Sequence, residues 1–289
     1  MLAAWQEPAS RDQFDMTDSL ESAFVGRIAV LATKHGKERV IASALRSGLG
    51  VEVTVPEGFD TDCFGTFTRD VPRQGSQREA ARRKAEAALA LAGGDLAIAS
   101  EGSFGPHPEV PFVTINIELV LLLDRLSGLE IVGSYVASTV VSGQRWVASP
   151  DEARTFAESV GFPDHGVIVR RDPDDPDLLF KAIEDDEDLR DATERVIAAT
   201  PARRAFIEVD LRAHRNPTRM AAIAAATDDL VANAMRRCPR CGTPGFSHLM
   251  SRPGLPCRWC RMPTNLVLAL EFGCVRCGER RDMPRPDGR

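Results

Sequence analysis

Six of the seven cysteines in this 289-residue chain lie after residue 237, and all six belong to Cys-x-x-Cys pairs. Pairs with this spacing are typical of structural zinc sites, in which four thiolates surround the ion as a tetrahedron. A short segment of this kind folds around its metal. The sequence therefore predicts a zinc ribbon over residues 236–289, separate from the rest of the chain. The pairs are Cys238/Cys241, Cys257/Cys260 and Cys274/Cys277.

Three pairs are one more than a single four-cysteine site needs. Segments 246–250 and 265–273 predict an outgoing and a returning strand, and the returning strand runs directly into Cys274. A hairpin would bring the first and third pairs together and leave the middle pair at its tip. The alternative site joins the first pair to the middle pair. In the hairpin arrangement the middle pair remains as free thiols, a disulfide or part of a second site with His248.

The net charge of the chain also changes sign at this boundary. From residue 236 onward there are eleven arginines, no lysine and four acidic residues, although the whole chain has a net charge of −6. A basic tail therefore follows an acidic domain. Because the guanidinium group of arginine can donate paired hydrogen bonds to phosphate oxygens, nucleic acid is one candidate partner of the tail. The alternative is that the arginines only solubilise a small ribbon.

The N-terminal residues predict no targeting signal. Residues 1–24 are acidic and lack the basic and apolar regions of a secretory signal, so we expect a flexible leader. No apolar run reaches the roughly 18 residues that a membrane helix needs. We therefore expect a cytoplasmic protein without a membrane partner. Its oligomeric state stays open, a dimer included.

Residues 25–235 predict an α/β domain. A strand over 27–33, a helix over 36–50 and a strand over 51–55 form a β-α-β opening, which favours parallel pairing. The predicted fold class is therefore α/β, with a mixed central sheet and flanking helices, followed by the zinc ribbon.

The next elements of this domain place a carboxylate at the end of a strand. Ser76 and Glu79 have the spacing of a capping box at the start of a long helix. A strand over 95–100 follows and ends on Glu101, within a turn that contains glycines and a proline. Such a carboxylate is costly unless it is paired or faces a cleft. Two long strands then form a hairpin around Ser127-Gly128.

Polar residues gather at the boundaries between strands and helices. Ligands of open α/β sheets bind outside the carboxyl ends of the strands. Two carboxylates there could hold Mg²⁺ together with substrate phosphates, and cations suit the phosphates themselves. The alternative is that Glu79 and Lys84 are solvated residues on a helix surface and that His214-Arg215 is the ordinary start of a helix. The residues are His35 and Lys37, Glu79 and Lys84, Glu101 and Ser103, and His214 and Arg215.

The order of these segments resembles the inosine triphosphate pyrophosphatase superfamily, whose members hydrolyse non-canonical purine nucleoside triphosphates to monophosphate and pyrophosphate. "VLATKHGKERV" is similar to the opening Ala-Thr-x-Asn-x-x-Lys-x-x-Glu of the family, and "EAARRKA" (79–85) to Glu-Asn-Ala-x-x-Lys-Ala. "ASEGSF" is similar to Ala-Asp-Asp-Ser-Gly-Leu, and "AHR" (213–215) to Ser-His-Arg. The resemblance covers residues 27–234 and indicates a divergent branch, a bacterial domain family of unassigned function with a C-terminal zinc ribbon.

The resemblance implies roles for individual residues. Glu79 and Glu101 would be the catalytic carboxylates, binding Mg²⁺ or activating water. The implied substrate-binding residues are Thr33, His35, Lys37, Lys84, Ser103, His214 and Arg215. The predicted function is metal-dependent hydrolysis of nucleoside triphosphates with release of pyrophosphate. Because Glu101 stands alone where the family has two aspartates, the alternative is a nucleotide- or nucleic-acid-binding protein without turnover.

Overall fold

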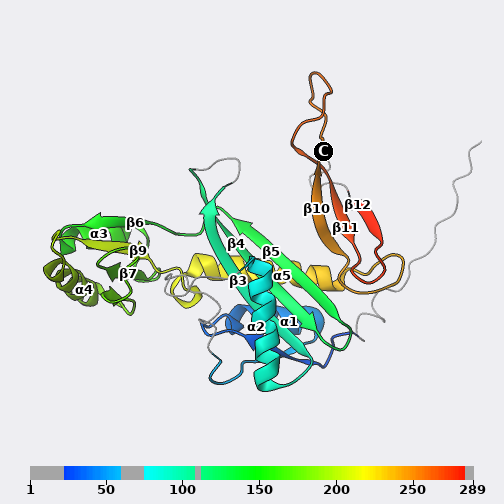
Figure 1. Cartoon of the computed structure of the whole chain (residues 1–289), viewed down its shortest axis with the longest axis horizontal. Helices are drawn as coiled ribbons and strands as arrows, with labels where there is room; N and C mark the ends of the chain where they lie inside the picture. Colours follow the sequence, from blue (N-terminus) through cyan, green and yellow to red (C-terminus); the bar gives the residue numbers. More distant parts are fainter. Residues whose placement is uncertain (1–22, 60–74, 108–111, 284–289) are drawn as a thin grey trace, which may run out of the picture.

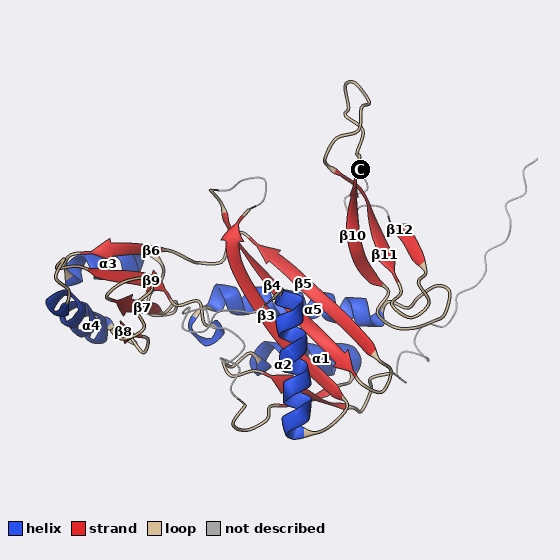
Figure 2. Cartoon of the chain, viewed as in Figure 1, coloured by secondary structure: helices blue, strands red, loops and turns tan. Residues whose placement is uncertain are grey.

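The computed structural model describes residues 23–59, 75–107 and 112–283, so the predicted leader 1–24 lies almost entirely outside the described residues. The described residues form three separate β-sheets, which Figures 1 and 2 show along the chain. Within these ranges no helix is long and apolar enough to cross a membrane.

The first sheet is mixed, which confirms the predicted fold class at this level. Its strand order is β2-β1-β3-β4-β5. The strands β2, β1 and β3 are parallel, as the β-α-β opening predicts, and β3, β4 and β5 are antiparallel. The strands are β1 Ile28–Ala32, β2 Glu52–Thr54, β3 Leu96–Pro106, β4 Thr114–Asp124 and β5 Leu129–Ala137.

Helices cover both faces of this sheet. Leu96 and Ile98 of β3 face a core shared with α1 (Glu38–Leu49) and α5 (Pro217–Met235). The alternate residues Ala97 and Ala99 face α2, whose own contact residues are mostly alanines. Helix α2 (Gln77–Ala92) begins with the predicted capping box between Ser76 and Glu79, which is confirmed.

A second, smaller sheet with its own core lies at the other end of α5 from the ribbon (Figure 1). Its strand order is β6-β9-β7-β8, and α3 and α4 pack on it. This unit was not predicted as separate within residues 25–235, because three of its strands have only two to four residues. The elements are β6 Gln144–Val147, α3 Pro150–Ser159, β7 Val167–Arg170, β8 Leu179–Phe180, α4 Asp186–Ala199 and β9 Ala205–Val209.

The third sheet is the C-terminal ribbon. Strands β10 (Ser247–Pro253) and β11 (Val267–Gly273) form the predicted hairpin, which is confirmed. A third strand, β12 (Arg280–Met283), pairs with β11 and was not predicted. The loop that joins β10 to β11 projects away from the other two sheets (Figure 1).

The prediction that a strand ends at Ser100 and that Glu101 lies in a turn is wrong. Strand β3 continues through Glu101 to Pro106, because β4 pairs with it along its whole length. Strand β1 ends earlier, where Ala32 pairs with Ala99. Beyond that point β3 is paired with β4 and no longer with β1. Charged and polar side chains of β3 and its neighbours gather along this part of the strand.

Helix α5 packs on β5 through a glycine. A Cβ atom at Gly133 would lie 2.1 Å from the backbone nitrogen of Leu230 and 2.4 Å from the carbonyl oxygen of Ala226. These are backbone atoms of a helix and cannot move aside without shifting α5.

We therefore expect Gly133→Ala to lower the free energy of unfolding by about 3 kcal/mol, the upper range for overpacking a core. Urea unfolding of the full chain measures this. Gly105→Ala is the matched control on the same sheet, because a Cβ there would meet no atom within 4 Å. Equal stability of the two variants would contradict the close packing of α5.

Candidate functional site

Polar residues collect at the edge where β1 ends and β3 continues. Lys37 is the N-cap residue of α1 and lies just beyond β1. It is buried, and its Nζ donates a hydrogen bond of 2.8 Å to Ser100 Oγ on β3. The loop after β1 therefore carries an ammonium group to the point where β3 extends beyond β1.

On the α2 face, Glu101 is paired. Its Oε1 lies 2.5 Å from Lys84 Nζ, and both side chains are buried. Gln77, at the start of α2, donates to the carbonyl oxygens of Glu101 (2.7 Å) and Ile117 (2.8 Å). Ser103 Oγ donates to Gln77 Oε1 at 3.3 Å. The N-terminal half of α2 is thus fixed to the extended part of β3.

On the opposite face, α5 contributes an arginine. Arg219 Nε lies 2.7 Å from Glu118 Oε1, and both side chains are almost fully buried. Asn116 also donates to Glu118 Oε1, at 2.9 Å. Gly102 lies opposite Glu118 in the sheet, and a Cβ there would be 2.5 Å from both Glu118 Oε1 and Arg219 Nη2. The glycine therefore makes room for this ion pair.

Among the described residues, three cations and two carboxylates meet at this edge, which is an excess of positive charge. Burial is the main cause that lowers the pKa of Lys37 to about 7, and the charge of Arg219 adds to the effect. Lys84 also lowers the pKa, whereas Glu118 and Glu101 raise it. A buried lysine of this kind reduces stability, and such groups are concentrated at functional sites. We call Lys37, Lys84, Glu101, Glu118 and Arg219 the edge cluster.

Two further features at the start of the loop after β1 suit an anion. Thr33 is buried, and its Oγ1 has no hydrogen-bond partner among the described residues. Helix α1 begins at Glu38, so the positive end of its dipole lies beside Lys37, although the N–H groups of Arg39 and Val40 already donate to backbone carbonyl oxygens. A helix N-terminus favours phosphate or carboxylate groups.

The histidines and Arg215 lie beyond the edge cluster. The rings of His35 and His214 stack, with centroids 5.0 Å apart. The pKa of His214 is lowered by partial burial and then by the charge of Arg212. Arg215 points to the second sheet, where its guanidinium donates a hydrogen bond to the carbonyl oxygen of Ile183. The structure thus brings His35 and His214 together and directs Arg215 elsewhere.

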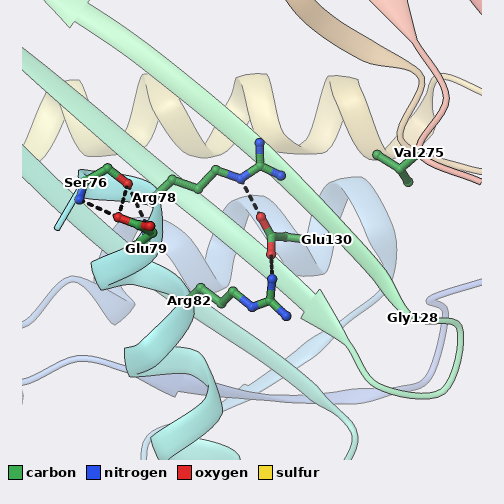
Figure 3. Close-up of a pocket in the computed structure, with 7 residues that line it drawn as sticks. All are labelled: Ser76, Arg78, Glu79, Arg82, Gly128, Glu130 and Val275. Atoms are coloured by element: carbon green, nitrogen blue, oxygen red, sulfur yellow. Dashed lines mark hydrogen bonds and ion pairs between the residues drawn. The ribbon is translucent and has the colours of Figure 1, made fainter. Parts of the chain in front are cut away.

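Glu79 lies on the solvent side of α2. Its carboxylate accepts from the backbone N–H of Ser76 at 2.7 Å and from the Ser76 hydroxyl at 2.9 Å, which lowers its pKa. Figure 3 shows it in a pocket between α2, the β4–β5 turn and the ribbon. Glu130 is paired there with Arg78 (2.5 Å) and Arg82 (3.5 Å). The Glu79 carboxylate is thus engaged in the capping box with Ser76 and is not part of the edge cluster.

Glu118 and Arg219 were missing from the predicted site. Each is a charged residue within an apolar pattern: Glu118 in the strand "TINIELVLLLD" and Arg219 in the first turn of the alanine-rich α5. Buried charges in such positions must be paired. That signal could have found both residues, but the sequence does not tell which charge pairs with which.

The ribbon brings the first and third cysteine pairs together. Cys238 Sγ lies 3.6 Å from Cys277 Sγ, and Cys241 Sγ lies 3.7 Å from Cys274 Sγ. All four sulfur atoms lie within 4.8 Å of one another. Four sulfurs at about 2.3 Å from a tetrahedral zinc ion would be about 3.8 Å apart, so the group fits such an ion. Cys257 and Cys260 lie in the loop at the tip of the hairpin.

The fold and the two sites define an α/β protein with a buried charge cluster and a C-terminal ribbon whose four cysteines could hold a metal ion such as zinc. Residues 84–289 match the model of the family DUF6671, described as a domain of unknown function, and the chain belongs to this family. A domain family of unknown function was predicted, and this is confirmed. A comparison with curated proteins finds no match.

The pKa of Lys37 predicts a pH-dependent effect of its replacement. Between pH 7 and 10 the unfolded chain binds a proton at Lys37 that the folded chain does not, because the ordinary pKa is 10.5. Wild-type stability therefore gains from Lys37 as pH rises through this window. Lys37→Met should be more stable than wild type at pH 7, and its advantage should shrink by up to about 1.4 kcal/mol per pH unit.

Urea unfolding at pH 7, 8, 9 and 10 measures this difference. Arg82→Met, an exposed position on α2, is the control and should give a constant difference. A Lys37→Met difference that does not change with pH would show that Lys37 is charged in the folded chain throughout.

The metal site predicts a second effect. Cys274→Ser should release one zinc ion per chain and unfold the ribbon, because structural zinc supplies most of the folding free energy of such a segment. Cys257→Ser should leave this site and the ribbon intact. Limited proteolysis of the full chain measures whether the ribbon is folded, and metal analysis measures the amount of bound zinc. Equal protease resistance of Cys274→Ser and wild type would contradict a metal-held ribbon.

Proposed function

We propose that the chain hydrolyses nucleoside triphosphates to monophosphate and pyrophosphate, with the edge cluster as the phosphate-binding site. The observation that carries the proposal is the convergence of Lys37, Lys84 and Arg219 on one edge, where the described part of the chain supplies two carboxylates. A triphosphate supplies the negative charge that balances this excess. The motif order that resembles the inosine triphosphate pyrophosphatase superfamily agrees with the same substrate class.

Each residue has a distinct task in this proposal. Lys37 and the N-terminus of α1 bind phosphate oxygens, and the unpartnered Thr33 hydroxyl donates to another. Arg219 is held by Glu118 and adds positive charge from the α5 face of the sheet, the face on which Lys37 bonds Ser100. Lys84 holds Glu101 in one orientation, and Glu101 accepts a proton from the attacking water.

Magnesium fits this site only in part. Mg²⁺ is usually bound by one or two carboxylates together with waters and substrate phosphates. In the described part of the chain, the one group of three or more close ligand side chains is the four cysteines. Glu101 would therefore be the single protein carboxylate, with Glu79 occupied in its capping box. When bound, the ion would supply charge neutralisation at the phosphates.

A second candidate function is binding without turnover, to nucleotide or nucleic acid. One observation favours it: within the described part of the ribbon, several exposed arginines have no ion pair. Phosphate contacts of this kind weaken steeply as salt rises. Titration of the full chain with RNA or DNA at two salt concentrations tests this function separately. The arginines are Arg240, Arg258, Arg261 and Arg276.

The test of hydrolysis is a panel of canonical and deaminated nucleoside triphosphates with Mg²⁺, with pyrophosphate as the measured product. At least one nucleotide should be turned over. Glu101→Gln should then lower the rate by about a hundredfold or more, as expected for loss of a general base. Arg82→Met, an exposed ion-pair residue on the helix that carries Lys84, is the control and should keep full activity.

Glu101→Gln leaves Lys84 buried without its partner, which is expected to cost about 3–5 kcal/mol of stability. The double variant Lys84→Met/Glu101→Gln removes both charges and should recover much of that loss while remaining inactive. Recovery of activity together with stability would assign Glu101 a structural role. Absence of pyrophosphate release from every nucleotide would overturn the proposed hydrolysis.

A further inference from the structure

The tip of the ribbon hairpin carries a cysteine pair that the four-cysteine group does not use. Cys257 and Cys260 lie in the loop between β10 and β11, which projects away from the other sheets (Figure 1). Cys260 is exposed and Cys257 is half-buried, and neither forms a disulfide. The function proposed above gives this pair no role.

The backbone around the tip pair is folded like the backbone around the two metal-site pairs. In each pair the N–H of the first cysteine donates to the carbonyl oxygen five residues on, at 2.8 Å for Cys257 and 2.9 Å for Cys238 and Cys274. In each pair the carbonyl oxygen of the first cysteine also accepts from the N–H four residues on, at 2.9 to 3.0 Å. The tip pair therefore has the local fold of a metal-binding pair.

The residue after the second cysteine makes this similarity more specific. In the two metal-site pairs it is a glycine in the left-handed region, Gly242 at φ 70° and Gly278 at φ 72°. At the tip it is Arg261, at φ 61°. A non-glycine residue there costs roughly 1 kcal/mol and persists only where the surroundings demand it. The loop thus keeps the metal-binding conformation without the residue that adopts it most easily.

Two thiolates are half of a tetrahedral zinc site. Among the described residues, no third cysteine, histidine or carboxylate joins Cys257 and Cys260 in a group of possible ligands. His248 lies at the other end of β10, where its ring contacts Phe272 and its Nε2 lies 3.2 Å from Ser251 Oγ. The missing ligands must therefore come from beyond the described part of this chain.

We propose that the tip pair is half of a second zinc site, completed by the tip pair of a second copy of this chain. Two copies related by a two-fold axis supply four thiolates to one ion on the axis. Such an interface is self-complementary, as in most homodimers. The projecting loop allows two tips to meet without contact between the remaining domains.

The surface of the tip suits this partner. Trp259 is 95% exposed and Met262 is 65% exposed, beside the cysteines. Large apolar side chains exposed together mark interaction sites, and a second tip would cover them. A zinc ion with four thiolates carries two negative charges, which the nearby cations Arg258 and Arg261 of both copies would offset. This proposal does not depend on the proposed hydrolysis.

The test uses the full chain, purified under reducing conditions with zinc as the added metal. We expect about 1.5 zinc ions per chain and a dimer by light scattering, because one ion is shared. The variant Cys257→Ser/Cys260→Ser should hold about one ion per chain and be a monomer at the same concentration. His248→Ala is the matched control and should leave both values unchanged.

A second variant distinguishes loss of the dimer contact from unfolding of the ribbon. Trp259→Asp keeps all six thiols and should weaken the dimer at least tenfold by burying a charge in the contact. One zinc ion per chain in a monomeric wild type would overturn the proposal, as would two ions per chain in a monomer. A half-equivalent of zinc that survives the double cysteine substitution would also overturn it.

Discussion

The extension of β3 beyond the end of β1 is the constraint on which the candidate site depends. As far as Ala99, β3 is paired on both edges, and its side chains belong to two apolar cores. From Ser100 onward it is paired with β4 and no longer with β1, and charged side chains lie beside this part of the strand. The backbone hydrogen bonds to β4 keep Glu101 and Gly102 in place. The same register sets Lys84 of α2 and Arg219 of α5 on opposite faces of one strand.

The edge cluster lowers the stability of the folded state. Burying charged groups requires each to be paired, and pairing rarely makes a buried ion pair better than an apolar contact of the same volume. Lys37 donates to the neutral Ser100 hydroxyl, and its burial lowers its pKa to about 7. A fold under selection for stability alone would replace this lysine. Binding of an anion at this site would explain why a destabilising lysine is present, since the ligand stabilises its charged form.

Local patterns in the sequence were enough to predict most elements. Capping signals, apolar spacing and the turn at Ser127-Gly128 located the long helices and the central hairpin. They failed at Glu101, because glycines and a proline signal a turn locally, whereas β4 extends the strand through long-range pairing. They also missed the second sheet, whose short strands are stabilised by their common core. Arg219 could not be placed in the site because its partner Glu118 is 101 positions away.

Binding of inorganic triphosphate to the full chain, measured by calorimetry from pH 6 to 9, tests the central claim most directly, because it needs no turnover. Since Lys37 has a pKa of about 7 and an anion favours its charged form, the ratio of wild-type to Lys37→Met affinity should be constant below that pH, which cancels the titration of the triphosphate itself. Above it, this ratio should fall by up to about tenfold per pH unit, and Lys37→Met should bind weakly at every pH. Absence of binding, or binding that depends neither on pH nor on Lys37, would contradict a phosphate site at this edge.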